Sequence, residues 1–122
     1  MPIVYTDTTG IDVPKSSDHI GTPALDDSPG VLLKAGEAYL TSCSYHNTTA
    51  ADAYIQIFDA VQLADVTLGT TVADYVIVCK AHEGDGYSFP IPIKFALGIC
   101  VFSTTAHDGS AAAIVDVWWG IG

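Results

Sequence analysis

Short apolar runs alternate with turn residues along most of the chain, and from residue 31 onward the apolar positions recur with the two-residue period of β-strands. In 54–58, Ile55 and Ile57 alternate with the other side chains, which predicts a strand with one buried face. Residues 75–79 are rich in β-branched side chains and predict a central strand. The predicted strands cover 31–34, 38–46, 54–58, 75–79, 87–95, 97–104 and 112–119.

The segment 87–95 combines a clear alternation with two prolines. Its odd-numbered positions are aromatic or isoleucine and are expected on one face, while Pro90 and Pro92 lie on the other. Proline cannot donate a hydrogen bond to a neighbouring strand, so this strand is expected at a sheet edge or leaving the sheet midway. Asp85 and Gly86 predict a turn before it.

These elements predict an all-β protein. About seven short strands separated by turn signals are typical of an antiparallel β-sandwich of jelly-roll or immunoglobulin-like type, here spanning residues 31–122. The only helical competitor, 49–53, is short and runs directly into a strand, so at most single helical turns are expected.

Residues 1–30 differ from the rest, because four prolines and three glycines interrupt every apolar run. This predicts an extended N-terminal arm. Its apolar content is too high for a solvated tail, so we expect it to dock on a neighbouring subunit; the alternative is that it wraps its own domain. The candidate docking residues are Ile3, Val4, Tyr5, Ile11, Val13, Ile20 and Leu25.

Two adjacent tryptophans, Trp118 and Trp119, occupy the last predicted strand. Neighbouring strand residues face opposite ways, so one indole is expected in the core and the other on the outer face or at an end. Trp119, the nearer to residue 122, is the candidate partner-binding residue of the pair.

The composition favours assembly. Charged residues make up only 15% of the 122 positions and hydrophobic residues 49%, so small neutral side chains must fill much of the surface. Such a surface loses little hydration when another subunit covers it, which fits an obligate homo-oligomer. The alternative is that a small β protein simply carries Thr and Ser on its outer strand faces.

The formal net charge is −10, and the chain contains no arginine. Phosphate-backbone binding depends on clustered cations, so direct nucleic-acid binding is excluded. A basic docking surface would complement the acidic chain. Residues 1–7 lack the features of a signal peptide, and no apolar run approaches the ~18 residues needed to span a bilayer, so neither secretion nor a membrane partner is expected.

Three cysteines, Cys43, Cys79 and Cys100, each lie in an apolar or alternating run, which predicts buried thiols in a reducing compartment. They form no paired motif of the kind that binds zinc. The segment 82–85 brings a histidine and two carboxylates together, and Asp59 and Asp65 flank another loop. Both sets have too few ligands at the required spacing for zinc or calcium and are interpreted as solvated loops.

The chain shows no nucleophile elbow and no phosphate-binding glycine loop, and the four histidines lie in the arm or at predicted strand ends. We therefore expect no catalytic residues, no metal and no cofactor.

The run 53–60, the loop 66–72 and the segment 89–105 followed by 107–110 resemble small virion proteins of tailed bacteriophages. In that family a Tyr-Ile/Leu-Gln-x-Phe-Asp-Ala strand leads to a Leu-Gly-Thr-Thr-Val loop, and a Phe/Gly-rich strand pair and a Thr-rich segment with Gly-Ser follow. The resemblance covers residues 29–122. This chain departs from the pattern at Ala73, where proline is expected, and in 97–101, where the glycine-rich strand is looser.

The resemblance implies a β-sandwich structural subunit of the virion, without enzymatic activity, assembled in the host cytoplasm. The first hypothesis is a capsid decoration or cement protein whose arm lies on the major capsid protein. The second places the chain in the neck, tail or a fibre, bound to other virion proteins. A third, from a different class, is a carbohydrate- or calcium-binding β-sandwich outside any virus.

Overall fold

The computed structural model describes residues 5–6, 12–13, 18–27 and 30–122. Two antiparallel four-stranded sheets form a β-sandwich, with strand orders β3-β10-β5-β8 and β4-β9-β6-β7. The first sheet contains β3 (Asp18–Leu25), β10 (Val115–Ile121), β5 (Ala38–His46) and β8 (Gly84–Phe95). The second contains β4 (Val31–Ala35), β9 (Gly98–Thr104), β6 (Ala53–Asp59) and β7 (Tyr75–Cys79). The short strands β1 (Tyr5–Thr6) and β2 (Asp12–Val13) pair with each other in a separate two-stranded sheet.

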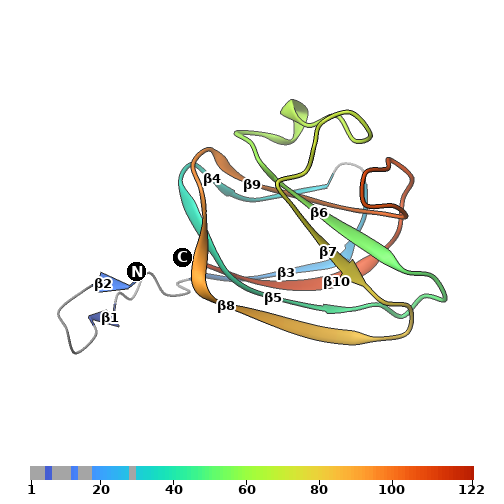
Figure 1. Cartoon of the computed structure of the whole chain (residues 1–122), viewed down its shortest axis with the longest axis horizontal. Coiled ribbons are helices and arrows are strands. Elements are labelled where there is room, and N and C mark those ends of the chain that lie inside the picture. The colour runs from blue at the N-terminus through green and yellow to red at the C-terminus, as the bar shows by residue number, and fades with distance from the viewer. Residues whose placement is uncertain (1–4, 7–11, 14–17, 28–29) are drawn as a thin grey trace.

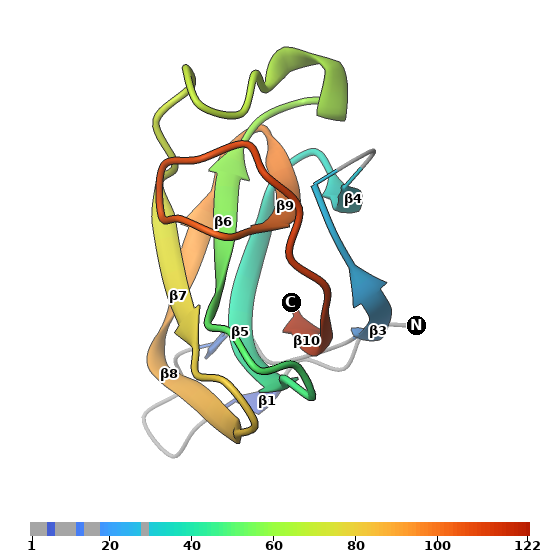
Figure 2. The ribbon, with the colours of Figure 1, turned by 90° about the vertical axis from the view of Figure 1, so that its right-hand side faces the viewer.

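The two sheets lie face to face, and their inward side chains make one hydrophobic core (Figures 1 and 2). Branched residues of β6 and β9 from one sheet meet Leu40, Val117 and Trp119 from the other. The all-β sandwich expected from the sequence is confirmed. Helical structure in the described residues is limited to the 3-10 turn η1 (Leu63–Asp65), and none of their segments is a helix long and apolar enough to cross a membrane.

Each of the seven predicted strands corresponds to a strand of the sandwich, and β3 is an eighth. β3 lies in the span that the sequence assigned to an arm, yet it pairs with β10 from Leu25↔Val115 to Asp18↔Ile121. Gly21 and Pro23 hid the strand from a pattern-based prediction, because both residues usually mark breaks. The extended arm therefore remains a prediction only for the residues that precede Asp18.

The prediction of a central strand at 75–79 was wrong, because among the described strands β7 pairs with β6 alone and lies at the edge of its sheet. Its β-branched residues made it look internal, but strand order is a long-range property. Tyr75, Val76 and Val78 are consequently exposed.

The prediction of an edge position for the proline-containing strand was correct, since β8 pairs with β5 and with no other strand in the described part of the chain. The pairing jumps from Leu40↔Ile93 to Ser42↔Ser88, so residues 89–92 oppose Thr41 alone and form a wide bulge. The bulge breaks the expected single apolar face: Phe95 is buried, whereas Ile91 is 84% exposed. The expected turn at Asp85 and Gly86 is also absent, because β8 already begins at Gly84.

The second sheet is covered on both faces. The loop 60–74 and the segment 105–113 lie over its outer side (Figure 1). Phe58 and Phe102 pack edge to face there, with ring centroids 5.6 Å apart. Gln56 is buried beneath the segment 105–113, donating hydrogen bonds to Thr104 Oγ1 and the carbonyl of Gly109. The prediction that 54–58 has one buried face was therefore wrong, because a distant segment closes the other face.

Candidate functional site

Two of the predicted docking residues contribute to the protein's own interior. Leu25 is only 2% exposed and belongs to the core, and Ile20 is half-buried against it. A side chain enclosed by its own chain offers no surface to a partner, so Leu25 is corrected to a core residue. Ile3, Val4 and Ile11 lie outside the described residues, and the side chains of Tyr5 and Val13 are likewise not described.

The adjacent tryptophans face opposite ways, as expected. Trp119 is 1% exposed, and its indole N–H donates to Thr22 Oγ1 at 2.9 Å. Trp118 is 50% exposed on the outer side of the first sheet. The choice of Trp119 as the partner-binding residue was therefore wrong, because the outward side chain is its neighbour. The sequence contained a signal for this. Val115, Val117 and Ile121 alternate in step with Trp119, so this apolar set shares one face of the strand, the face that packs in the core.

Trp118 stands in a groove of about 580 Å³ on the outer face of the first sheet. Small or polar residues surround it, including His19 and Gly21 of β3, Ser42 and Ser44 of β5, and Ser88 of β8. Among the residues that the structure describes, no Asp, Glu or Lys lines the groove. An exposed indole beside hydroxyl groups can pack against an apolar surface of a ligand while polar groups of the same ligand find hydrogen-bond partners.

A second hollow, of about 340 Å³, opens between the edge strands β7 and β8. Its lining is mainly apolar and comes from both sheets, with Leu40, Ile57, Val76, Phe89 and Ile93 among the contributors. Exposed Tyr75, Val78 and Tyr87 flank the opening. We call this region the β7–β8 opening. Chemically it can contribute contact area but few directional interactions.

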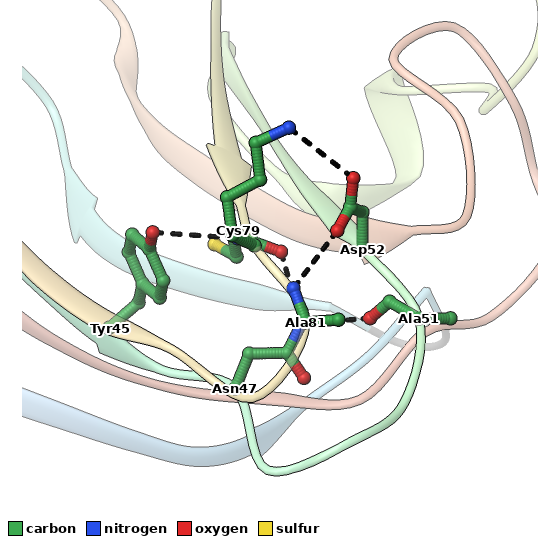
Figure 3. Close-up of polar contacts among 7 residues, drawn as sticks. Tyr45, Asn47, Ala51, Asp52, Cys79 and Ala81 are labelled. Carbon is green, nitrogen blue, oxygen red and sulfur yellow. Dashed lines mark hydrogen bonds and ion pairs between the residues drawn. The ribbon is translucent and has the colours of Figure 1, made fainter.

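A buried polar cluster joins the two sheets near the ends of β5, β6 and β7 (Figure 3). The Asn47 side chain is fully buried, and its Nδ2 donates to the carbonyls of Ala51 at 2.9 Å and Cys79 at 3.0 Å. Its Oδ1 accepts from the backbone N–H and the hydroxyl of Thr49. All four hydrogen-bonding positions of the amide are thus filled, so this cluster is structural.

Asp52 lies at the rim of the same cluster (Figure 3). Its Oδ1 accepts from the Ala81 backbone N–H at 2.9 Å, and its Oδ2 is 3.5 Å from the Lys80 ammonium. The Ala81 hydrogen bond, helped by Lys80, lowers the pKa of Asp52 from 3.8. These contacts fix the loop between β7 and β8 to the start of β6.

The loop carboxylates have structural partners. Asp59, interpreted from the sequence as solvated, accepts hydrogen bonds from the backbone N–H groups of Ala96, Leu97 and Gly98. It thereby holds the turn between β8 and β9, where a Cβ on Gly98 would come within 2.6 Å of the Ala60 carbonyl oxygen. In the part of the chain that the structure describes, no three His, Cys, Asp or Glu side chains gather as metal ligands would.

All three cysteines are buried and unpaired, as the sequence predicted for their packing. Burial raises the pKa of the Cys43 and Cys79 thiols from 9.0 to about 12. Burial also raises the pKa of Cys100. A nucleophilic thiol needs an accessible thiolate, so these groups are suited to packing and not to reaction.

Comparison of the chain with models of known protein families, with curated proteins and with solved structures found no match.

Proposed function

We propose that this chain is a non-enzymatic structural protein of a tailed-bacteriophage virion. In the first form of the proposal it is a capsid decoration or cement protein, which self-associates and docks on the major capsid protein through its N-terminal arm. The phage assignment rests on the sequence resemblance, and the assembly role rests on one observation, the exposed apolar β7–β8 opening. A neck, tail or fibre position in the same virion is the alternative.

We also propose that the sandwich is a jelly roll. The supporting observation is the strand order: consecutive strands from β3 to β10 alternate between the two sheets, except that β6 and β7 form a hairpin within the second sheet. Jelly rolls occur in viral capsid and lectin domains. The arrangement is compatible with a virion subunit, but by itself it selects no function.

The β7–β8 opening supports self-association. Among the described residues, no strand pairs with the outer edge of β7. Its five residues include no charge and no proline, so β7 lacks the features that usually prevent edge strands from pairing between molecules. The bulge of β8 adds Ile91 as an exposed apolar side chain on the neighbouring edge. Both edges belong to one molecule, so a second copy can present a matching apolar surface across a two-fold axis. We therefore assign the opening to a second copy of the chain.

The test of self-association is the mass of the isolated full-length protein measured by light scattering after size exclusion. The native chain should be oligomeric, and Val76→Lys should yield folded monomers because a charge then lies in the apolar contact. Val72→Lys is the matched control, since Val72 is 87% exposed on a loop outside the opening. A native chain that stays monomeric at high concentration, or an oligomer unaffected by Val76→Lys, would overturn the assignment.

The virion role is tested on purified particles of the phage that encodes the chain. Quantitative mass spectrometry should find it on the order of hundreds of copies per particle if it covers the symmetric head, and far fewer if it belongs to the neck, tail or a fibre. Its absence from particles would end the proposal. Removal of residues 2–17, which spares β3, should abolish attachment to heads while the sandwich stays folded. Full attachment of the truncated chain would exclude docking through the arm.

A further inference from the structure

Trp118 occupies an unusual position for an exposed aromatic side chain. It lies in the middle of β10, an inner strand, where the register places Gly21 of β3 on one side and Ser44 of β5 on the other. Ser44 in turn pairs with Gly86 of β8. The indole is therefore the only large side chain in a row that crosses all four strands.

Gly21 determines where the indole lies. A Cβ at this position would be 3.3 Å from Cδ1 and 3.4 Å from Nε1 of Trp118, so the five-membered ring covers the place where a side chain would stand. The indole thus leans towards β3. The space over β5 and β8 stays open and forms the groove of about 580 Å³, which is within the roughly 300–1,000 Å³ typical of ligand sites.

The groove offers polar but mostly uncharged groups. Ser42, Ser44 and Ser88 bring hydroxyls, and His19 brings an imidazole. Among the described residues the N–H of Trp118 has no hydrogen-bond partner, in contrast to that of Trp119. An aromatic platform with hydrogen-bonding groups beside it is therefore open to a ligand.

The surroundings discriminate among ligand classes. Anions are disfavoured, because none of the described lysines, Lys34, Lys80 and Lys94, lines the groove and the chain carries a net charge of −10. An added peptide strand is disfavoured, because β10 and β5 are inner strands already paired on both sides. A sugar ring satisfies the geometry, since it has an apolar C–H face for the indole and hydroxyl groups for the serines and the imidazole.

We propose that the Trp118 groove binds a neutral carbohydrate, with one sugar ring stacked on the indole and its hydroxyl groups hydrogen-bonded to Ser42, Ser44, Ser88 and His19. This site lies on the first sheet, apart from the β7–β8 opening and from the predicted arm. It goes beyond the virion role and does not depend on it.

The first experiment is an array of neutral oligosaccharides probed with the full-length chain, followed by titration of the best binder with tryptophan fluorescence and calorimetry. Binding should shift the Trp118 emission to shorter wavelength, because the ligand removes water from the indole. No binding to any neutral glycan overturns the proposal. Preferential binding of an anionic compound or a peptide overturns it as well.

Variants then locate the site. Trp118→Ala should weaken binding at least about tenfold, as expected for removal of a central aromatic contact, while Trp118→Phe should keep part of the affinity. Gly21→Ala should also weaken binding, because the new methyl group displaces the indole. Ile114→Ala is the matched control, since Ile114 is similarly exposed but lies outside the groove. Unchanged affinity in a folded Trp118→Ala protein would show that the glycan binds elsewhere.

Discussion

The indole N–H of Trp119 donates to Thr22 Oγ1 at 2.9 Å and joins residues 97 positions apart. The Thr22 hydroxyl in turn donates to the carbonyl of Val117 at 3.0 Å. One buried hydroxyl thus ties β3 to β10. For this reason a truncation that tests the arm must stop before Asp18, because removal of residues 18–25 would also remove an edge strand of the sandwich.

Thr22→Val should lower the free energy of unfolding by about 1–3 kcal/mol, because the isosteric side chain leaves the buried indole N–H without its acceptor. Urea unfolding followed by tryptophan fluorescence measures the change. Thr70→Val, on an exposed loop, is the control and should stay within about 0.5 kcal/mol of the native chain. Equal stability of the two variants would contradict a stabilising role for the Thr22 hydrogen bond.

Replacement of each tryptophan by alanine should lower the free energy of unfolding by very different amounts. Trp119→Ala opens a cavity in the core and should cost about 3–5 kcal/mol, whereas Trp118→Ala removes a half-exposed ring and should cost less than about 1 kcal/mol. The emission of the remaining tryptophan reports the same difference: Trp119 alone should emit at shorter wavelength than Trp118 alone. Similar losses of stability in both variants would mean that Trp118 has a structural role.

Asn47→Ala should destabilise the sandwich by at least about 2 kcal/mol, because it removes two donors and one acceptor from a fully buried cluster. Equilibrium unfolding in urea gives the value. Thr48→Ala, at an exposed neighbouring position, serves as control. Hydrogen exchange should show the loss of protection first where β5, β6 and β7 meet. A change confined to the exposed loop would contradict the assignment of Asn47 as a link between sheets.

The buried thiols predict a loss of stability at alkaline pH. The pKa of Cys43 and Cys79 rises from 9.0 to about 12 on folding, so below pH 9 the stability is complete, and between pH 9 and 12 the unfolded chain releases protons that the folded chain keeps. Unfolding midpoints in urea should therefore fall as the pH rises above 9. The raised pKa of Tyr45, caused mainly by burial, acts in the same direction.

The double variant Cys43→Ala/Cys79→Ala should show a shallower decline over the same pH range. In the native chain both thiols should react slowly with a thiol reagent at pH 8 and rapidly in urea. Labelling of the folded chain as fast as the unfolded one would contradict burial of the thiols.

The strands themselves were predictable because alternation is a local property. The segment 38–46 was assigned with the bounds that β5 has, and the prolines of β8 correctly indicated an edge, since a missing N–H has the same consequence in any fold. The burial of the three cysteines followed equally from their apolar neighbours. The opposed directions of Trp118 and Trp119 needed no more than the pleat of a strand.

Strand order and the covering of faces were decided by the tertiary structure. The sequence of β7 predicted a central strand, but the strand lies at an edge. Gln56 was expected on the outward face but is buried by the segment 105–113. Leu25 was assigned to an arm but lies in the core. In each case the deciding contact comes from a residue far away in the sequence. A local pattern fixes which side chains share a face, whereas the partner that buries or exposes that face is chosen only when the whole chain packs.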